Sequence, residues 1–351
     1  MEPTKKPFIK NPIAVILIFG LIAFVVYVLF FIDPSQVLAI LSQINPIYYA
    51  GAFVAYVFFT VFSALVWRRL LKNLTVEISA RKALLYTWVG LFFEATIPQL
   101  GWSGEVSKIY LLFKDAKIDT GKIGASVVGQ KIFVLTMTVV SLGVGLTSVL
   151  LSYPLPLTAT VLIATVLSLS LTVLILVYYV SIKPSATKTL LNWGLRIAVF
   201  FRRSWNPENF KQKAEDMLNR FHTNINQLKT NPKRLILPIV YSVLSFICEV
   251  SVVFLSFIAL GYPVPVDKVL IVFTLTGTLQ SVGVTFFGFP EIIMSASFSA
   301  LGIPVPLSFS VTLLSRIVTL WFRLIVSYIA FQWVGIKILR NQQTQSQPTV
   351  R

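Results

Sequence analysis

Long apolar stretches, separated by short polar segments, dominate the chain. Six of them reach the roughly 20 residues that an α-helix needs to cross the hydrocarbon layer of a membrane. Such runs with few charges predict membrane-spanning helices rather than the amphipathic helices of a soluble protein. The predicted spans are Pro12–Ile32, Ile47–Trp67, Ile123–Leu151, Leu157–Ile182, Leu235–Leu260 and Leu307–Ile336.

The first predicted span starts like a retained anchor. Asn11 occupies a cap position and Pro12 the first helical position, and both are common at helix starts. Lysines precede the apolar core, and no small-residue cleavage site follows it. We therefore expect an anchor, not a removed signal peptide.

Two further apolar stretches are broken by glycine and proline. In the first, Ala83–Pro98 is followed by Gln99–Glu105 and a short second arm. In the second, Val269–Pro290 contains three glycines, and another short arm follows Glu291. Each pattern predicts a re-entrant helical hairpin. Its tip should face protein or a wet cavity, because lipid cannot satisfy the backbone groups that a broken helix frees.

The distribution of basic residues supports this layout. The chain has 30 Lys and Arg against 13 Asp and Glu, a formal net charge of +17. If the six spans cross and both hairpins return to their own side, every base outside the spans falls on one side except Lys268. Cytoplasmic loops carry such an excess. We therefore predict a multi-pass protein of the cell membrane with both termini in the cytoplasm.

The same layout contains a duplication. The order span, span, hairpin, span occurs in residues 12–151 and again in 157–336, and the two copies begin on opposite sides of the membrane. Inverted repeats with broken helices are typical of secondary transporters. The sequence therefore predicts an all-α polytopic membrane protein, with about six transmembrane helices and two re-entrant hairpins in an inverted repeat.

A basic connector, residues 183–234, separates the two halves. Residues 188–203 mix apolar and basic side chains, which suits a helix lying in an anionic headgroup layer. A second helix is predicted from Asn206 to Leu228. We interpret the connector as cytoplasmic and lipid-contacting and expect no nucleic-acid partner. The Gln/Ser/Thr-rich residues 341–351 predict a disordered tail.

The chain offers few residues for catalysis or metal binding. A single cysteine, Cys248, and a single histidine, His222, exclude an intrachain disulfide and a His/Cys metal cluster, and argue against a histidine-based triad. A site made only of carboxylates stays open. No phosphate-binding Gly-x-x-x-x-Gly-Lys-Ser/Thr loop is present. We expect a protein that is not an enzyme, needs no cofactor and hydrolyses no ATP.

Ionisable residues within the apolar segments are the functional candidates. A charge near the centre of a membrane helix costs roughly 2.5 to 3.5 kcal/mol on insertion scales, so it is normally paired or lines a water path. Three bases and four acids suggest ion pairs, either within each half or between halves. Arg323 follows Arg316 by two helical turns, which predicts one shared stripe. The candidates are Glu94, Glu105, Lys131, Glu249, Glu291, Arg316 and Arg323.

Two roles are open for these charges. In a structural role, each glutamate satisfies a helix N-terminus and a base holds it in place. In a functional role, the bases and the hairpin tips form a cationic groove for an anionic headgroup, since guanidinium groups and helix N-termini bind phosphate well. Glu94 would cap or snorkel near a tip, and Glu249 would be a buried partner of one base.

Several motifs resemble a known family. They are Ile97-Pro-Gln-Leu-Gly-Trp-Ser-Gly-Glu105 with its continuation to Leu112, and Gly288-Phe-Pro-Glu291 with Ser315-Arg316. Over residues 12–338 the chain resembles the flippase-like transmembrane domain family, also called the lysylphosphatidylglycerol synthase transmembrane region or UPF0104 family. The resemblance implies movement of lipids or lipid-linked headgroups between leaflets. Three positions depart from the family pattern, which bears on the headgroup more than on the fold: Ile97, Lys108 and Gln130-Lys131.

Three functions are compatible with these observations. The first is a lipid translocator, driven by a gradient, a proton or another ion. The second is a non-catalytic scaffold or partner subunit for a lipid-modifying or glycosyl-transfer enzyme. The third is a membrane enzyme whose carboxylates act on a lipid-linked sugar. We expect membrane lipids with an anionic headgroup as partners. The aminoacyl-lipid synthase module of bifunctional members is not expected, because little chain follows Ile336.

Overall fold

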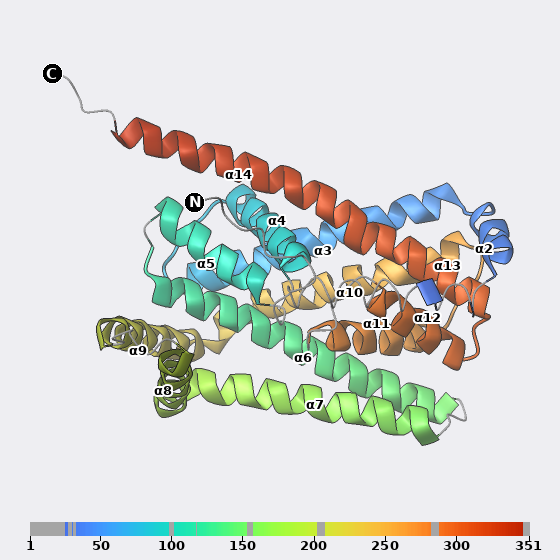
Figure 1. The fold of residues 1–351 in the computed structure, drawn as a ribbon, viewed down its shortest axis with the longest axis horizontal. Helices are drawn as coiled ribbons and strands as arrows, with labels where there is room; N and C mark the ends of the chain where they lie inside the picture. Colours follow the sequence, from blue (N-terminus) through green and yellow to red (C-terminus); the bar gives the residue numbers. More distant parts are fainter. Residues whose placement is uncertain are drawn as a thin grey trace, which may run out of the picture.

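The computed structural model is a bundle of helices (Figure 1). It describes residues 25–26, 30, 33–97, 102–116, 118–152, 157–201, 208–281 and 288–346. Within these ranges the chain forms helices joined by turns and contains no strand. The all-α prediction is confirmed.

Five helical segments in the described part of the chain are long and apolar enough to cross a membrane. They match five of the six predicted spans. The remaining one, Pro12–Ile32, lies almost entirely outside the described residues. The five are α3 (Pro46–Asn73), α6 (Thr120–Ser152), α7 (Leu157–Ile182), α10 (Ile236–Ala259, preceded by the 3₁₀ turn η2, Pro232–Leu235), and the continuous run of α13 (Val305–Arg316), the π-helical η3 (Ile317–Phe322) and α14 (Arg323–Ser346).

The centre of the bundle is the packed pair α3 and α10 (Figure 1). Along α3 the residues at every fourth position are buried, namely Ala52, Tyr56, Thr60 and Ala64. This spacing forms one face of the helix, and three of the four side chains are small. Small residues let two membrane helices approach closely, because packing rather than water exclusion holds them together in lipid. The Ser245 hydroxyl of α10 donates to the Phe59 carbonyl of α3 at 3.0 Å.

Two pairs of shorter helices occupy the predicted hairpin positions. α4 (Ala80–Thr96) and α5 (Ser103–Ala116) pack antiparallel: Tyr86 near the start of α4 donates to Asp115 near the end of α5 at 2.6 Å. α11 (Val266–Ser281) and α12 (Phe289–Ala300) are also antiparallel, since Lys268 donates to the Leu301 carbonyl at 2.7 Å. The predicted tips, residues 98–101 and 282–287, lie outside the described residues.

Helix α2 (Pro34–Leu41) has no counterpart in the predicted elements. Its start is nevertheless encoded locally. Asp33 is the N-cap, its carboxylate accepts from the Ser35 N–H at 2.9 Å, and Pro34 follows in the first helical position. α2 packs against α13 through Val37 and Phe309. Its eight residues are far fewer than the roughly 20 that mark a membrane span in a sequence.

The connector contains both predicted helices, α8 (Pro184–Phe201) and α9 (Glu208–Thr230). α9 packs against α6 and buries Ile225 and Leu228. The tail predicted as disordered starts at residue 341, and α14 continues into it as far as Ser346. Extending a formed helix needs no new nucleus, and glutamine is a good helix former. Residues 347–351 lie outside the described residues.

His222 of α9 links the two connector helices to the end of α7. Its ring contacts the Ser181 carbonyl at the end of α7 and the Thr187 hydroxyl of α8. Burial lowers the pKa of His222 below 6.5, and the positive charges of Lys229 and Lys188 act in the same direction. The unfolded chain therefore takes up this proton at a higher pH than the folded protein, so acid favours unfolding.

We expect the protein to lose stability as the pH falls below about 6.5, and the variant His222→Asn to lose less. Thermal unfolding of both proteins in detergent, followed across that pH range, measures the difference. Carboxylates titrate in both proteins, so only the difference reports on His222. Parallel pH profiles would contradict this expectation.

Candidate functional site

The most enclosed ion pair joins α12 to the end of α13. Gly288 precedes α12 with φ 104°, a left-handed conformation that favours glycine. This turn lets Glu291 reach back, and its Oε2 accepts from the Gly288 N–H at 2.8 Å. Glu291 Oε1 accepts from Arg316 Nε at 2.6 Å. Only 1% of the Glu291 side chain is exposed. The structure thus selects pairing within the half, one of the alternatives left open above.

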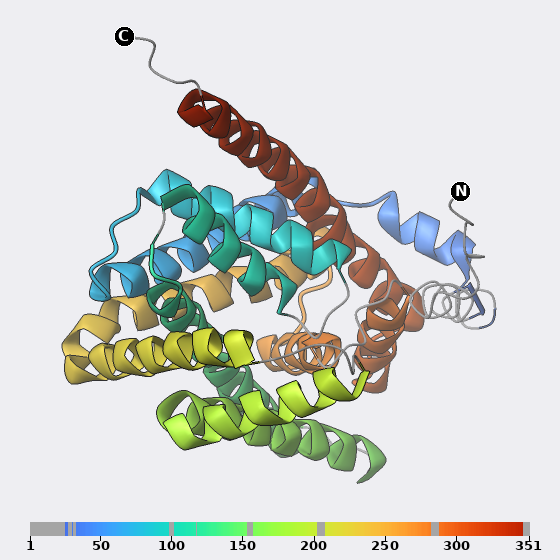
Figure 2. The same ribbon diagram turned by 60° about the vertical axis from the view of Figure 1, so that its left-hand side comes forward.

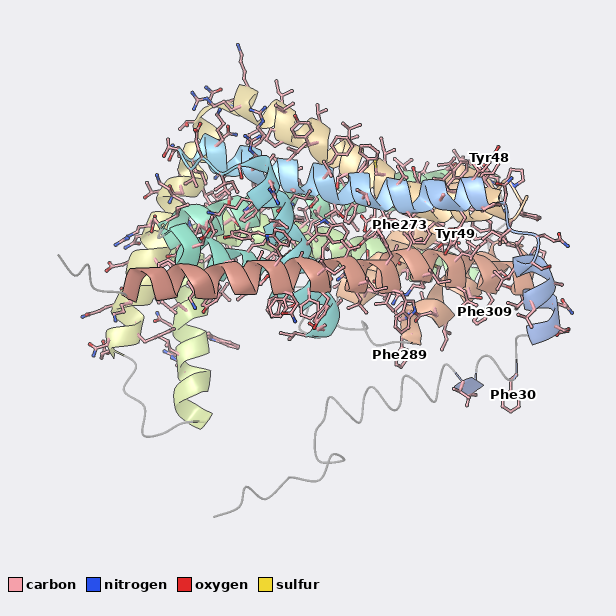
Figure 3. The ribbon with its side chains drawn as sticks, turned by 90° about the horizontal axis from the view of Figure 1, so that it is seen from above. Phe30, Tyr48, Tyr49, Phe273, Phe289 and Phe309 are labelled. Atoms are coloured by element: carbon pink, nitrogen blue, oxygen red, sulfur yellow. The ribbon has the colours of Figure 1, made fainter. Side chains whose placement is uncertain are left out.

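A pocket of about 160 Å³ adjoins this pair. Its walls are apolar except for the two charged side chains. α2 contributes Leu41 and the π-helical turns contribute Trp321, so elements that the sequence did not predict help to shape it. Tyr49, between α3 and the α13–α14 run in Figure 3, fixes the neighbouring backbone by donating to the Leu314 carbonyl at 3.1 Å. The pocket is lined by Leu41, Glu291, Leu313, Leu314, Arg316, Ile317 and Trp321.

A second ion pair joins α5 to α6. Lys131 donates to Glu105 Oε1 at 3.1 Å, and about four-fifths of each side chain is buried. The Lys131 ammonium also lies 5.3 Å from the centre of the Trp102 ring, within range of a cation–π contact. Glu105 Oε2 is buried and has no hydrogen-bond partner among the described residues. This carboxylate therefore keeps one buried acceptor site available.

The third ion pair crosses between the halves. Arg323 Nη2 lies 3.4 Å from Glu94, and the guanidinium donates to the Leu91 carbonyl at 3.0 and 3.2 Å. α14, in red, packs against α4, in cyan (Figure 2). Glu249 of α10 interacts electrostatically with Arg323 but forms no ion pair among the described residues. Its predicted direct pairing is therefore not observed.

The predicted stripe shared by Arg316 and Arg323 is wrong. The two side chains bind carboxylates from different helices, α12 and α4. The π-helical turns of η3 separate them, and such turns contain more residues than α-helical ones. A periodicity based on the α-helix therefore misplaces Arg323.

Lys108 is a buried base that the sequence did not mark as a candidate site residue. Only 8% of it is exposed in the structure. Its ammonium donates to Gln130 Oε1 at 3.4 Å and lies 5.6 Å from the Trp67 ring centre. Gln130 is held in turn by bonds to Ser63. The available signal was its spacing, because Lys108 lies three residues after Glu105 on one face of a helix.

A comparison with known proteins places the chain. The family described as "Lysylphosphatidylglycerol synthase TM region" matches residues 13–327. The chain belongs to this family. The UPF0104 membrane protein of Methanocaldococcus jannaschii is 25% identical over 88% of this chain and 90% of its own length. A UPF0104 membrane protein of Methanothermobacter thermautotrophicus is 22% identical, over 94% of this chain and 97% of its own. No solved structure matches.

Membership confirms the resemblance drawn from the Gly-Glu motifs, and with the long apolar helices it identifies a multi-pass membrane protein. In this member of the family each motif glutamate, Glu105 or Glu291, is bound by a base from the helix run that follows its hairpin. In the second motif Gly288 allows the chain to turn before α12, and in both motifs the carboxylate is tied to a neighbouring membrane helix.

The candidate charged residues, taken together with Lys108, include equal numbers of bases and acids. Each of the three predicted bases pairs with a carboxylate, and including Lys108 gives four bases and four acids. The groove predicted as cationic is therefore a set of ion pairs. Among the described residues, no three Cys, His, Asp or Glu side chains gather where they could hold a metal ion.

Proposed function

We propose that the protein moves a phospholipid or a lipid-linked headgroup between the leaflets of the cell membrane. The pocket at Glu291 and Arg316 carries this proposal, because it combines one ion pair with apolar walls. An amphiphile with an anionic head matches both features. Arg316 contacts Glu291 through Nε, and a lipid phosphate can compete for the guanidinium, which binds phosphate in a bidentate manner.

We further propose that α4–α5 and α11–α12 are re-entrant hairpins of two inverted repeats. α5 has 14 residues and α12 has 12, well short of the roughly 20 needed to cross the hydrocarbon layer. Each pair is antiparallel, and each returning helix bears a glutamate bound by a base from a neighbouring helix. This arrangement suits alternating access around broken helices. Both termini are cytoplasmic in this proposal.

Movement of the lipid in this proposal is an exchange of partners without covalent chemistry. A headgroup phosphate replaces Glu291 on Arg316, and Glu291 keeps its bond from the Gly288 N–H. Release restores the ion pair. The partners are membrane lipids with an anionic headgroup, and the protein does not act as an enzyme.

Reconstitution in liposomes tests the proposal. The wild-type protein should accelerate leaflet exchange of a fluorescent anionic lipid relative to empty vesicles. The double variant Glu291→Gln/Arg316→Gln removes both charges and should slow exchange at least about tenfold, which corresponds to about 1.4 kcal/mol. The double variant Lys72→Gln/Glu77→Gln is the matched control, because its 3.4 Å ion pair is exposed.

Two outcomes would contradict the proposal. One is the absence of acceleration by the folded wild-type protein. The other is full exchange activity in the charge-free double variant, which would favour a structural role for the pair and a scaffold function for the protein.

A further inference from the structure

A second pocket, of about 300 Å³, lies where α3 ends and α10 begins. Asn73, the last residue of α3, forms one side, and the end of α9 forms another. Arg234 of η2 supplies a positive charge, and no acidic residue lines the pocket. Five of the six lining residues are polar, in contrast to the apolar pocket at Glu291. The lining residues are Asn73, Gln227, Leu228, Thr230, Asn231 and Arg234.

Two of these side chains form hydrogen bonds with the backbone of other lining residues. The Asn73 amide donates to the Arg234 carbonyl at 3.0 Å, and the Thr230 hydroxyl donates to the Gln227 carbonyl at 2.8 Å. The side chains of Gln227, Asn231 and Arg234 form no hydrogen bond within the described part of the chain. Two carboxamides and one guanidinium thus offer donors to the same space.

Two other bases nearby, Lys72 and Lys229, have partners of their own, and Lys233 does not line the pocket. Lys72 pairs with Glu77 at 3.4 Å. The Lys229 ammonium lies over the Tyr178 ring, 5.9 Å from its centre. Among the lining residues, Arg234 is the base. Guanidinium and amide N–H groups together are suited to phosphate oxygens.

The position of the pocket indicates its depth in the membrane. It lies at the shared end of two membrane-spanning helices, and bases cluster at that end. Such clusters lie at the level of the headgroups, where anionic lipids gather around them. A volume of about 300 Å³ is at the small end of ligand pockets, so it matches a headgroup rather than a whole lipid.

We propose that this pocket binds a phosphate-bearing anion, with Arg234 as the charged ligand and Gln227 and Asn231 as hydrogen-bond donors. An anionic phospholipid headgroup and free phosphate share this chemistry. The site is separate from the pocket at Glu291 and does not depend on lipid transport. A bound headgroup would fasten the end of α9 to the start of α10.

The test uses the full-length protein in detergent, titrated with phosphatidylglycerol, phosphatidylcholine or inorganic phosphate. Native mass spectrometry counts the bound lipids, and thermal unfolding reports on phosphate. Arg234→Gln should weaken phosphatidylglycerol binding about fivefold, in line with about 1 kcal/mol for one base near a membrane surface. Lys213→Gln is the control, since Lys213 is an exposed base of α9 that does not line the pocket.

The titrations distinguish a lipid headgroup from free phosphate as the ligand. Selective retention of phosphatidylglycerol that is sensitive to Arg234 identifies a lipid site. Stabilisation by inorganic phosphate that is sensitive to Arg234, without preference for phosphatidylglycerol, identifies a site for free phosphate. Equal binding of both lipids and of phosphate by wild type and Arg234→Gln overturns the proposal. Leaflet exchange by Arg234→Gln should match that of the wild type. Failure of this binding proposal can therefore be told apart from failure of the transport proposal.

Discussion

Replacing Arg316 alone with methionine should destabilise the folded protein by about 3 to 5 kcal/mol, the usual cost of stranding a buried charge. The reason lies in Glu291, whose side chain is 1% exposed. Without the guanidinium, the Gly288 N–H is the one hydrogen-bond partner that this carboxylate keeps among the described residues. The carboxylate charge then lies in a low-dielectric interior without its main partner. Denaturant titration in mixed micelles measures the free energy of unfolding.

The double variant Glu291→Gln/Arg316→Met provides the decisive comparison. It removes both charges, and a neutral amide can still accept from Gly288, so most of the lost stability should return. Lys72→Met breaks an exposed ion pair and should cost less than about 1 kcal/mol. Equal destabilisation by the single and double variants would show that Arg316 acts through packing rather than through its charge.

The membrane spans could be predicted because their signal is local. A run of apolar residues long enough to cross the bilayer requires a helix, since lipid satisfies no backbone group. α7 begins and ends at the predicted residues, Leu157 and Ile182, and the neighbouring spans differ from prediction by a few residues. For Glu105 and Glu291, the sequence predicted that each would pair with a base, because a charge inside such a run needs a partner. It did not predict which base each one would bind.

What could not be predicted depends on tertiary packing. Nothing in residues 317–322 marks them as π-helical, and this turn decides which carboxylate Arg323 reaches. Lys108 follows a polar turn and resembles a loop base until α5 packs against α6 and buries it. The pairing of Arg323 with Glu94 joins residues from different halves, so no spacing within one half could indicate it.

Close approach of α4 and α5 is another consequence of packing that only the structure reveals. A Cβ added to Gly104 would lie 2.7 Å from the Gly90 carbonyl oxygen, and one added to Gly90 would lie 3.1 Å from the Gly104 oxygen. The obstacle is backbone on both sides, so no side chain can rotate away. The two glycines therefore set the distance between the helices and, with it, the position of Glu105 next to Lys131.

The variant Gly104→Ala should accordingly destabilise the protein by about 1 to 3 kcal/mol, the range for overpacking a filled interior. Alanine improves intrinsic helix propensity by up to about 1 kcal/mol, which opposes but does not cancel the clash. Gly143→Ala in α6 is the matched control, because nothing lies within 4 Å of its added Cβ. The control should keep or raise the thermal midpoint while Gly104→Ala lowers it. If Gly104→Ala is as stable as the control, the hairpin arms can separate at little cost, and the glycine contact does not fix the position of Glu105.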